Sequence, residues 1–424
     1  MNIKIADSWL REYLITKARP LELAEKLSLT SVSVEKVEKI DNDYVYDIEV
    51  TSNRLDLMSV IGIAREAFAI LPRFGIDAKL EIPQSKITLS KEKFPILIKS
   101  DSKIVNRITT VAIDVTVKPS PGYIKERLEA SGIRSLNNLI DVTNYVMRET
   151  GHPVHVFDYD RLNTSELTIR ESKQGEKIIT LDKKEHILST GNIIAVNKKE
   201  EIVDLLGVMG TLNSVVTENT KRILLFLDNN EPSHIRKTSM SLGIRSEAAI
   251  LNEKGVDPEL AMATLTRGIE LYSQIANGKV ISEIYDDYPN KPKVQTITVT
   301  KEKIDKIIGV EISLKQVESI LISLGFKTKL LANKIEAIVP SFRANDISLQ
   351  EDIIEEIARV FGYHNLPSIL PPLREAESYN LASDNFYWET RIKNTLKYWG
   401  FTEIYTYSMI PENLLEGPRE EAVK

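Results

Sequence analysis

Two stretches of the sequence resemble each other in a way that restricts the possible folds. The first contains LELAEKLSL, IEVTSNRLDL and IGIAREAF, and the second contains LKQVESILISL, IEAIVPSFRANDI and IEEIARVFGY. Arg54 and Arg343 both end a V-x-S-x-R pattern, and Ala64-Arg65 matches Ala358-Arg359. Such an internal repeat predicts the same supersecondary unit twice. We therefore expect two related α+β modules, at residues 1–82 and 291–372.

The region between the two modules predicts a larger mixed α/β domain over residues 83–290. Helices are expected at residues 122–130, 138–149 and 257–276. Runs rich in β-branched residues predict strands at ITTVAIDVTV, LTIRES, EKIITLD, NIIAVN, RILLFLD and VISEIYDDYP. The stretches PRFGIDAKLEIP and DDYPNKPKV are typical of linkers.

A further module begins at residues 373–424, with the predicted helix NFYWETRIKNTLKYWG and the predicted strand FTEIYTYSM. Taken alone, this partial module would expose Trp388, Trp399 and Phe401 unless a partner covers them. A chain of 424 residues is too long for one ordinary core, so several domains are expected. The fold class is therefore multidomain α+β.

Composition excludes several classes of protein. The sequence has no cysteine, which excludes a disulfide framework, thiolate metal sites and cysteine nucleophiles. The net charge of −6 argues against a protein that coats nucleic acid through bulk charge. The first residues, MNIKIADSWLREYL, contain no apolar signal core, and no uncharged apolar run is long enough to span a membrane. We expect a cytoplasmic protein.

The segment SFRANDISLQEDIIEEIARVFGYHN, residues 341–365, is rich in carboxylates. Asp352, Glu355 and Glu356 share one side of a predicted helix, which is typical of a solvated acidic face. Ser348-x-x-Glu351 predicts a capping box at its start. The alternative is that these side chains, with Asp346 just before the helix, converge on a hard divalent cation such as Mg²⁺. Spacing alone leaves both interpretations open.

Several long motifs resemble the bacterial-type phenylalanyl-tRNA synthetase β subunit. YDIEVTSNRLDLMSVIGIARE, GIRSLNNLIDVTNYVMRETGHPVHVFDYDRL, NEKGVDPELAMATLTRGIELYSQIANG and VPSFRANDISLQEDIIEEIARVFGYHNLP are similar to signatures of that family. The resemblance covers nearly the whole chain. It implies that residues 83–290 form a tRNA-editing-type domain and that residues 373–424 begin a synthetase-like antiparallel core.

The resemblance also implies a function. Members form an α₂β₂ heterotetramer in which the α subunit attaches phenylalanine to tRNA(Phe) using ATP, and the β subunit hydrolyses tyrosine mischarged onto that tRNA. DNA and membranes are not expected partners. The family binds Mg²⁺, at a site shared with α, through carboxylates that correspond here to Asp346, Asp352, Glu355 and Glu356.

The editing site of the family corresponds to Arg134, Thr143, Asn144 and His155, with Gly207 and Gly210 in the substrate-binding loop. Threonine, asparagine and histidine can position water and hydrogen-bond an ester, and arginine can bind a phosphate. The structural alternatives are that Thr143 and Asn144 only satisfy helix backbone and that His155 is a packed strand residue.

The sequence departs from the family at several points. Phe226 stands where the family carries a glutamate that recognises the tyrosine hydroxyl, and a phenyl ring is a poor acceptor for that hydrogen bond. We therefore expect weakened editing, with Asp228 as a possible substitute on the same strand face. The OB-fold insert of the family is missing from the first module, and the sequence stops at EEAVK, early in the core module.

Three functional interpretations follow. The chain is the β subunit or an N-terminal part of it, a free-standing hydrolase that edits mischarged tRNA in trans, or a non-enzymatic RNA-binding scaffold. The absence of a G-x-x-x-x-G-K-[ST] phosphate loop from the sequence agrees with aminoacylation chemistry on a partner.

Overall fold

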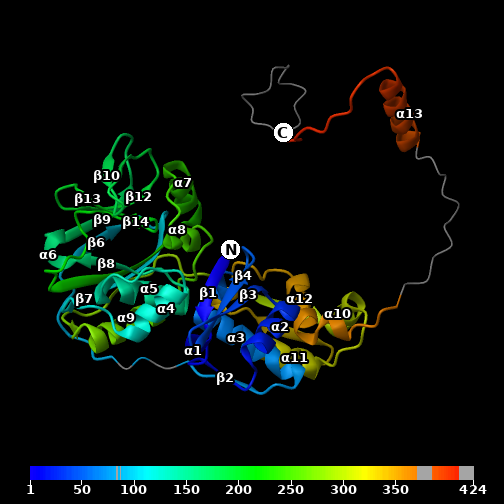
Figure 1. Ribbon diagram of the computed structural model, residues 1–424, viewed down its shortest axis with the longest axis horizontal. Helices are drawn as coiled ribbons and strands as arrows, with labels where there is room; N and C mark the ends of the chain where they lie inside the picture. The colour runs from blue at the N-terminus through cyan, green and yellow to red at the C-terminus, as the bar shows by residue number, and fades with distance from the viewer. Residues whose placement is uncertain (83–84, 86, 370–383, 410–424) are drawn as a thin grey trace. The chain divides into compact units, whose positions relative to one another are not determined.

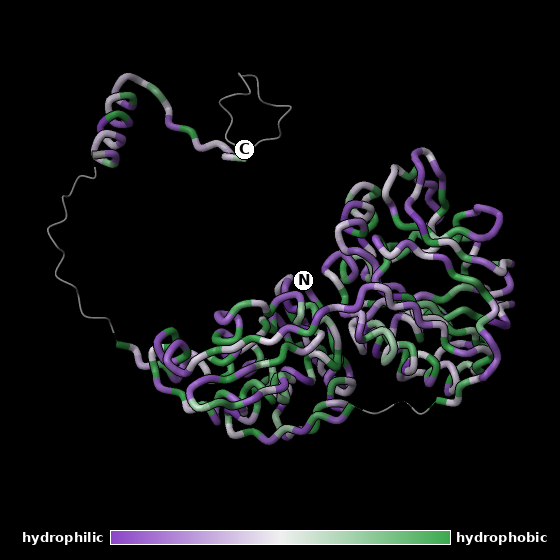
Figure 2. Tube along the Cα trace, turned by 180° about the vertical axis from the view of Figure 1, so that it is seen from behind, coloured by the Kyte–Doolittle hydropathy of each residue, from purple (hydrophilic) through white to green (hydrophobic). Residues whose placement is uncertain are grey.

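The fold of residues 1–366 is built on sheets covered by helices, as the computed structural model shows (Figure 1), and all of the sheets are antiparallel except where β6 pairs with β9 in parallel. The structure describes residues 1–82, 85, 87–369 and 384–409. Residues 367–424 belong to a second unit. No helix in these described ranges is long and apolar enough to cross a membrane, and Figure 2 shows hydrophilic residues interrupting the hydrophobic stretches.

The first segment of the chain forms a three-stranded antiparallel sheet in the order β1-β4-β3, with helices packed against it. A small second sheet pairs β2 with β5. The residues 72–83, expected to be a linker, instead include a 3₁₀ helix and β5, because Leu14 to Thr16 offer a strand edge for pairing. The elements are β1 (Asn2–Ala6), α1 (Asp7–Leu10), β2 (Leu14–Thr16), α2 (Pro20–Thr30), β3 (Ser33–Ile40), β4 (Asp43–Glu49), a 3₁₀ helix (Leu55–Leu57), α3 (Val60–Ile70), a 3₁₀ helix (Leu71–Phe74) and β5 (Ala78–Leu80).

The middle segment contains two five-stranded sheets. One has the order β16-β7-β15-β8, and its fifth strand, β17, also pairs with β7. The other has the order β14-β13-β12-β9-β6. Helix α9 packs on β7 and β15, and α5 packs on α9. The elements are β6 (Leu97–Ser100), β7 (Val105–Asp114), α4 (Gly122–Ala130), α5 (Asn138–Thr150), β8 (His155–Asp158), α6 (Tyr159–Leu162), β9 (Glu166–Glu171), β10 (Lys177–Ile179), β11 (Glu185–Ile187), β12 (Ile193–Asn197), β13 (Ile202–Leu205), β14 (Met209–Gly210), β15 (Arg222–Asn230), α7 (Pro232–Leu242), α8 (Glu247–Asn252), α9 (Leu260–Ile275), β16 (Lys279–Val280) and β17 (Tyr285–Asp287).

The predicted helices of this segment are present, but three further helices, α6, α7 and α8, were not predicted. Helices α6 and α8, YDRL and EAAILN, are too short to show a periodicity, and α7, PSHIRKTSMSL, is rich in serine. The predicted strand VISEIYDDYP is divided into β16 and β17, because Ser282 leaves the ladder and its hydroxyl accepts a hydrogen bond from the Ala112 amide.

The third segment repeats the topology of the first. Its sheet has the order β18-β20-β19, and its elements are β18 (Thr296–Thr300), α10 (Lys301–Ile308), α11 (Leu314–Ser323), β19 (Lys327–Leu330), β20 (Lys334–Ile338), a 3₁₀ helix (Ser341–Arg343), α12 (Gln350–Phe361) and a 3₁₀ helix (Tyr363–Asn365). Both segments place the third strand of the sequence between the other two, and both follow it with a 3₁₀ turn and a helix. The sequence repeat therefore extends to the order of the elements.

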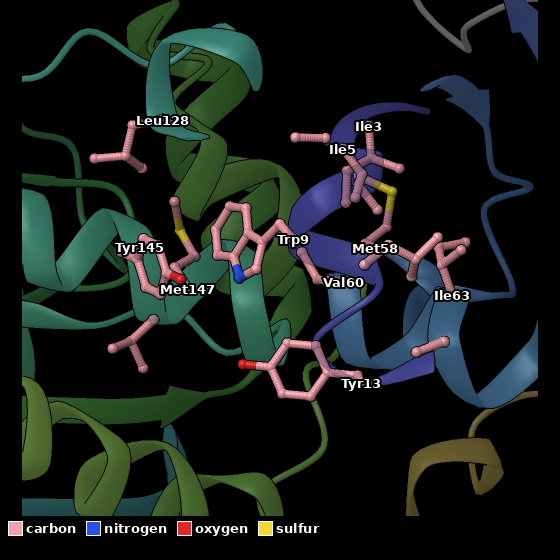
Figure 3. Packing of buried hydrophobic residues seen from close by; sticks show 14 of the residues in the cluster. Ile3, Ile5, Trp9, Tyr13, Met58, Val60, Ile63, Leu128, Tyr145 and Met147 are labelled. Atoms are coloured by element: carbon pink, nitrogen blue, oxygen red, sulfur yellow. The ribbon is translucent and has the colours of Figure 1, made fainter. Parts of the chain in front are cut away.

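A buried aromatic cluster joins the first segment to the middle one. Trp9 of α1 is fully buried and stacks on Tyr145 of α5, with ring centroids 4.2 Å apart. Figure 3 shows Trp9 between Tyr145 on one side and Met58 and Ile63 on the other. Burial of aromatic rings of this size contributes strongly to stability. This packing holds the face of α5 that lies away from the cavity described below.

The second unit contains α13 (Asp384–Tyr398) among its described residues. This helix was predicted, whereas residues 401–409, predicted to contain a strand, are not in one. A strand needs a hydrogen-bonded neighbour. Trp388, Trp399 and Phe401 are exposed by 52%, 73% and 64%, as expected of this segment. Other parts of the predicted final module, residues 373–383 and 410–424, lie outside the described residues.

Candidate functional site

A cavity of about 560 Å³ lies in the middle segment between α5, α8 and the strands β8, β13, β14 and β15. Helix α5 begins after Asn137, whose side chain accepts hydrogen bonds from the amides of Leu139 and Ile140 at 3.0 and 3.1 Å. This cap fixes the register of the helix, so that Thr143 and Asn144 lie on the cavity wall. The Thr143 hydroxyl donates to the Ile140 carbonyl at 2.7 Å, so its oxygen keeps its capacity to accept.

Two glycines bring the backbone of the β13–β14 turn close to the other cavity walls. Gly207 has φ +69°, and a Cβ there would lie 2.8 Å from Cδ1 of Ile235. A Cβ on Gly210 would lie 2.8 Å from Cε1 of His155. Both positions therefore require the absence of a side chain. The close approach presents main-chain groups to anything bound in the cavity.

His155 lies at the centre of this arrangement. It is on β8, directly opposite Phe226 of β15, and it lines the cavity. Its Nε2 has no hydrogen-bond partner among the described residues and lies 3.9 Å from Oδ1 of Asp204. Burial lowers the pKa of His155 to about 4, so the imidazole is neutral near pH 7. A neutral imidazole can accept a proton or a hydrogen bond from water.

Two buried aspartates complete the polar part of the cavity. Burial, followed by the nearby charge of Asp228, raises the pKa of Asp204. Burial also raises the pKa of Asp228 to about 6, although the Asn230 side-chain amide donates a hydrogen bond to its carboxylate. Sequence reasoning missed Asp204 and considered Asp228 only as a substitute for a missing glutamate. The available signal for Asp204 was a carboxylate inside the apolar run IVDLL.

The structure brings together five of the residues predicted for this site. Thr143, Asn144, His155, Gly207 and Gly210 all line the cavity.

Two other predicted residues lie elsewhere. Arg134 is exposed and does not belong to the cavity lining. Phe226 is fully buried beneath it and packs edge-to-face on Phe157, with centroids 5.5 Å apart. Asp228, two residues further along β15, lines the cavity instead. A molecule bound in the cavity would therefore contact Asp228 of this strand and not the ring of Phe226.

The predicted metal residues are placed differently. Asp346 accepts hydrogen bonds from the guanidinium of Arg343 at 2.9 to 3.1 Å. Glu356 is buried between Arg343 and Arg359, with contacts of 2.5 to 2.8 Å, and both guanidinium groups lower its pKa. The expectation of a solvated acidic face is therefore wrong for Glu356.

The other two predicted metal residues, Asp352 and Glu355, lie in different environments. Asp352 caps α12, because its carboxylate accepts from the amides of Ser348 and Leu349 at 2.7 Å each. The predicted capping box is thus incorrect by one position, and Glu351 instead pairs with Lys303 at 2.6 Å. Glu355 is exposed. Within the described residues, no group of three or more acidic or histidine side chains could hold a metal ion. The four carboxylates as placed in this chain do not fit a Mg²⁺ site.

The buried arginines of the two repeated segments form one ionic cluster. Arg54 contacts Asp56 at 2.9 and 3.0 Å and Glu66 at 3.0 Å. Arg343 likewise pairs with two carboxylates, those of Asp346 and Glu356. Arg359 of α12 donates both to Glu356 and to Glu66 of α3. The cluster joins α3 and α12, and it explains the repeated V-x-S-x-R pattern.

Comparisons with known proteins identify what the chain is similar to. Residues 105–277 match the model of the B3/4 domain, and residues 297–363 match that of the tRNA synthetase B5 domain. The chain is 35% identical to the phenylalanine–tRNA ligase β subunit of Carboxydothermus hydrogenoformans, over 89% of this chain and 46% of that protein. It is 34% identical to the Fusobacterium nucleatum β subunit, over 88% and 46%.

A solved structure also resembles the chain. An N-terminal fragment of the phenylalanyl-tRNA synthetase β subunit from Pyrococcus horikoshii matches with a TM-score of 0.49 and 13% identity, covering 86% of this chain and 100% of that one. The chain spans about half the length of the curated relatives it matches, 46% in each case given above.

Proposed function

Because the chain belongs to the family of phenylalanine–tRNA ligase β subunits, we propose that it works with an α subunit that attaches phenylalanine to tRNA(Phe) using ATP. In this proposal the assembly is an α₂β₂ heterotetramer. The role of this chain is to support α, to contact tRNA and to hydrolyse mischarged aminoacyl-tRNA. The proposed division is two small modules, at residues 1–82 and 291–372, around an editing domain at 83–290.

The observation that carries the editing proposal is the cavity around His155. An ester can be hydrolysed where a water is held beside the carbonyl carbon and the developing oxyanion meets hydrogen-bond donors. The neutral His155 imidazole can accept a hydrogen bond from such a water. Asn144 and the backbone near Gly207 and Gly210 can contact the ester and the terminal ribose. The apolar wall formed by Ile140 and its neighbours is suited to an amino-acid side chain.

Magnesium and ATP are assigned in this proposal to the complex. Asp346 and Glu356 are each held by arginine, so the carboxylates in the described part of the chain do not converge as the oxygens of a Mg²⁺ site must. No step of the proposed hydrolysis uses a metal ion.

The test is deacylation of tyrosyl-tRNA(Phe) and phenylalanyl-tRNA(Phe) by the purified chain, with and without α. We expect the tyrosyl ester to be cleared faster, and His155→Ala to slow clearance at least tenfold. His234→Ala is the matched control, since His234 lies on α7 and contacts Glu231 and Glu171 away from the cavity.

The presence of α distinguishes the competing interpretations. Hydrolysis by the isolated chain at the rate of the complex would favour a free-standing hydrolase that acts in trans. Equal rates for His155→Ala and the unmodified chain would refute the proposed site. RNA binding without hydrolysis in either sample would favour a scaffold.

A further inference from the structure

The cavity around His155 has an unbalanced charge. Its described lining contains four acidic side chains, Asp182, Asp204, Asp228 and Glu247, and neither lysine nor arginine. Two of the four have partners of their own. Glu247 is half exposed and pairs with Arg148 at 3.1 Å. Asp182 lies at the rim and accepts a hydrogen bond from the Thr180 hydroxyl at 2.6 Å.

The two inner aspartates have no cationic partner among the residues that the structure describes. Asp204 is only 3% exposed, and its Oδ1 makes no hydrogen bond to any described residue. His155 Nε2, a further atom of the cavity lining that can accept, is also buried without a partner in the described chain. Buried polar atoms are normally satisfied. These acceptors are therefore arranged for a ligand that donates several hydrogen bonds.

We propose that Asp204 and Asp228 bind the protonated primary amine of an amino acid or aminoacyl ester seated in this cavity. An ammonium group has three donors and no acceptor, which complements a group of acceptors. This inference deepens the proposed editing function and rests on it for the choice of ligand. It assigns to Asp204 and Asp228 a role in binding, separate from the hydrolytic role of His155.

The charge of the pair matches one ammonium group. Asp228, with a pKa near 6, is mostly ionised at pH 7, whereas burial and the charge of Asp228 favour the protonated form of Asp204. The pair is therefore negatively charged at pH 7, and Asp228 carries that charge. A monovalent cation would compensate this charge in a site whose described lining supplies no lysine or arginine.

The apolar surface of the same cavity limits the class of amine. Ile133, Ile140, Met147, Val154 and Val208 line the space outside the aspartate pair. Such a surface suits an apolar or aromatic side chain attached to the amine, and it disfavours a bare metal cation or a strongly hydrated polyamine. An amino acid carrying an aromatic side chain satisfies both parts of the cavity.

The test is calorimetric titration of the purified full chain with L-tyrosinamide, which carries the amine, and with 3-(4-hydroxyphenyl)propanamide, which lacks it. We expect removal of the amine to weaken binding at least tenfold. Asp204→Asn combined with Asp228→Asn should abolish this difference. Asp182→Asn, which removes a rim charge of the same kind, should preserve it. A thermal unfolding curve for each variant verifies folding, and Asp228→Asn alone serves if the double variant does not fold.

Two results would overturn the inference. One is equal affinity of the unmodified chain for the two amides. The other is a folded aspartate variant that still prefers the amine tenfold. The rival explanation is that the cavity recognises the phenol instead of the amine, and L-phenylalaninamide, which lacks the phenol, tests it. An affinity for L-phenylalaninamide far lower than that for L-tyrosinamide would support this explanation and overturn the inference.

The source of the amine is distinguished by two further probes that both carry it, free L-tyrosine and a non-hydrolysable 3′-tyrosylamino-3′-deoxyadenosine. Tighter binding of the adenosine probe supports the aminoacylated end of a tRNA, and equal binding supports a free amino acid. Amine-dependent binding without any ester hydrolysis would support this inference and refute the proposed editing function, so the two failures are separable.

Discussion

The strongest test of the fold is Glu66→Gln, which changes the ionic cluster between α3 and α12. Glu66 is 3% exposed, and its carboxylate accepts hydrogen bonds from Arg54 at 3.0 Å and from Arg359. Glutamine keeps the shape of the side chain but removes its charge. Two buried guanidinium groups would then lose a shared counterion.

The magnitude follows from the protonation of Glu66. Arg359 and Arg54 offset the cost of burial and lower its pKa from 4.5 to about 2. A shift of this size corresponds to about 3 kcal/mol of the free energy of unfolding at neutral pH. Because the folded-state pKa is lowered, this contribution is complete above the unfolded pKa and is lost as the pH falls through 2. At pH 3 it should therefore be reduced to about 1 kcal/mol.

The assay is urea unfolding of the unmodified chain and of Glu66→Gln at pH 7 and pH 3, followed by tryptophan fluorescence. We expect the variant to lose about 3 kcal/mol at pH 7 and much less at pH 3. Glu25→Gln, on the exposed face of α2, is the control and should change stability by less than about 0.5 kcal/mol. A Glu66→Gln variant within about 0.5 kcal/mol of the unmodified chain at pH 7 would refute the reasoning.

Three more predictions concern residues in and next to the cavity. Asp228→Asn should stabilise the chain at pH 8 by up to about 3 kcal/mol and have little effect at pH 4. The raised folded-state pKa means that the ionised Asp228 destabilises the fold as the pH rises above the unfolded pKa, and this cost is complete above pH 6. Equal effects in thermal melts at both pH values would contradict this. Gly207→Ala should lower the free energy of unfolding by about 1 kcal/mol or more and weaken the binding of L-tyrosinamide. The reason is that Gly207 has a φ of +69° and that Ile235 occupies the space of the added Cβ. An unchanged urea midpoint and an unchanged affinity would contradict it. Phe226→Glu should lower the free energy of urea unfolding by about 3 kcal/mol or more, because it buries an unpaired carboxylate. Phe226→Leu should lower it less. A stable Phe226→Glu chain would show that position 226 reaches the cavity.

Much of the local structure follows from the sequence because the periodic segments are long and their caps are strong. The helix predicted at residues 122–130 has those bounds, and α5 extends the predicted 138–149 by one residue. Arg54 and Arg343 were recognised as equivalent from sequence, and in the structure each is buried and pairs with two carboxylates. Short segments were less predictable, since β5 and α8 depend on partners that are distant in sequence.

The candidate site was only partly predictable for a physical reason. His155 and Asp204 are distant in sequence, and the antiparallel pairing of β8 with β15 and of β13 with β14 brings their strands to one cavity. A sequence pattern identifies the residue types but not which of them share an environment. The same limit applies to α12, where helical spacing grouped Asp352, Glu355 and Glu356. The structure separates them, because Arg343 and Arg359 draw only Glu356 into the interior.

The contact between Arg359 and Glu66 spans 293 residues of sequence. A ribosome adding about 5–20 residues per second would need roughly 15–60 seconds between making one partner and the other. During that interval the nascent first module holds a carboxylate that has only one of its two cations. Its final stability is therefore acquired late in synthesis, and the order in which the modules emerge becomes part of how the chain folds.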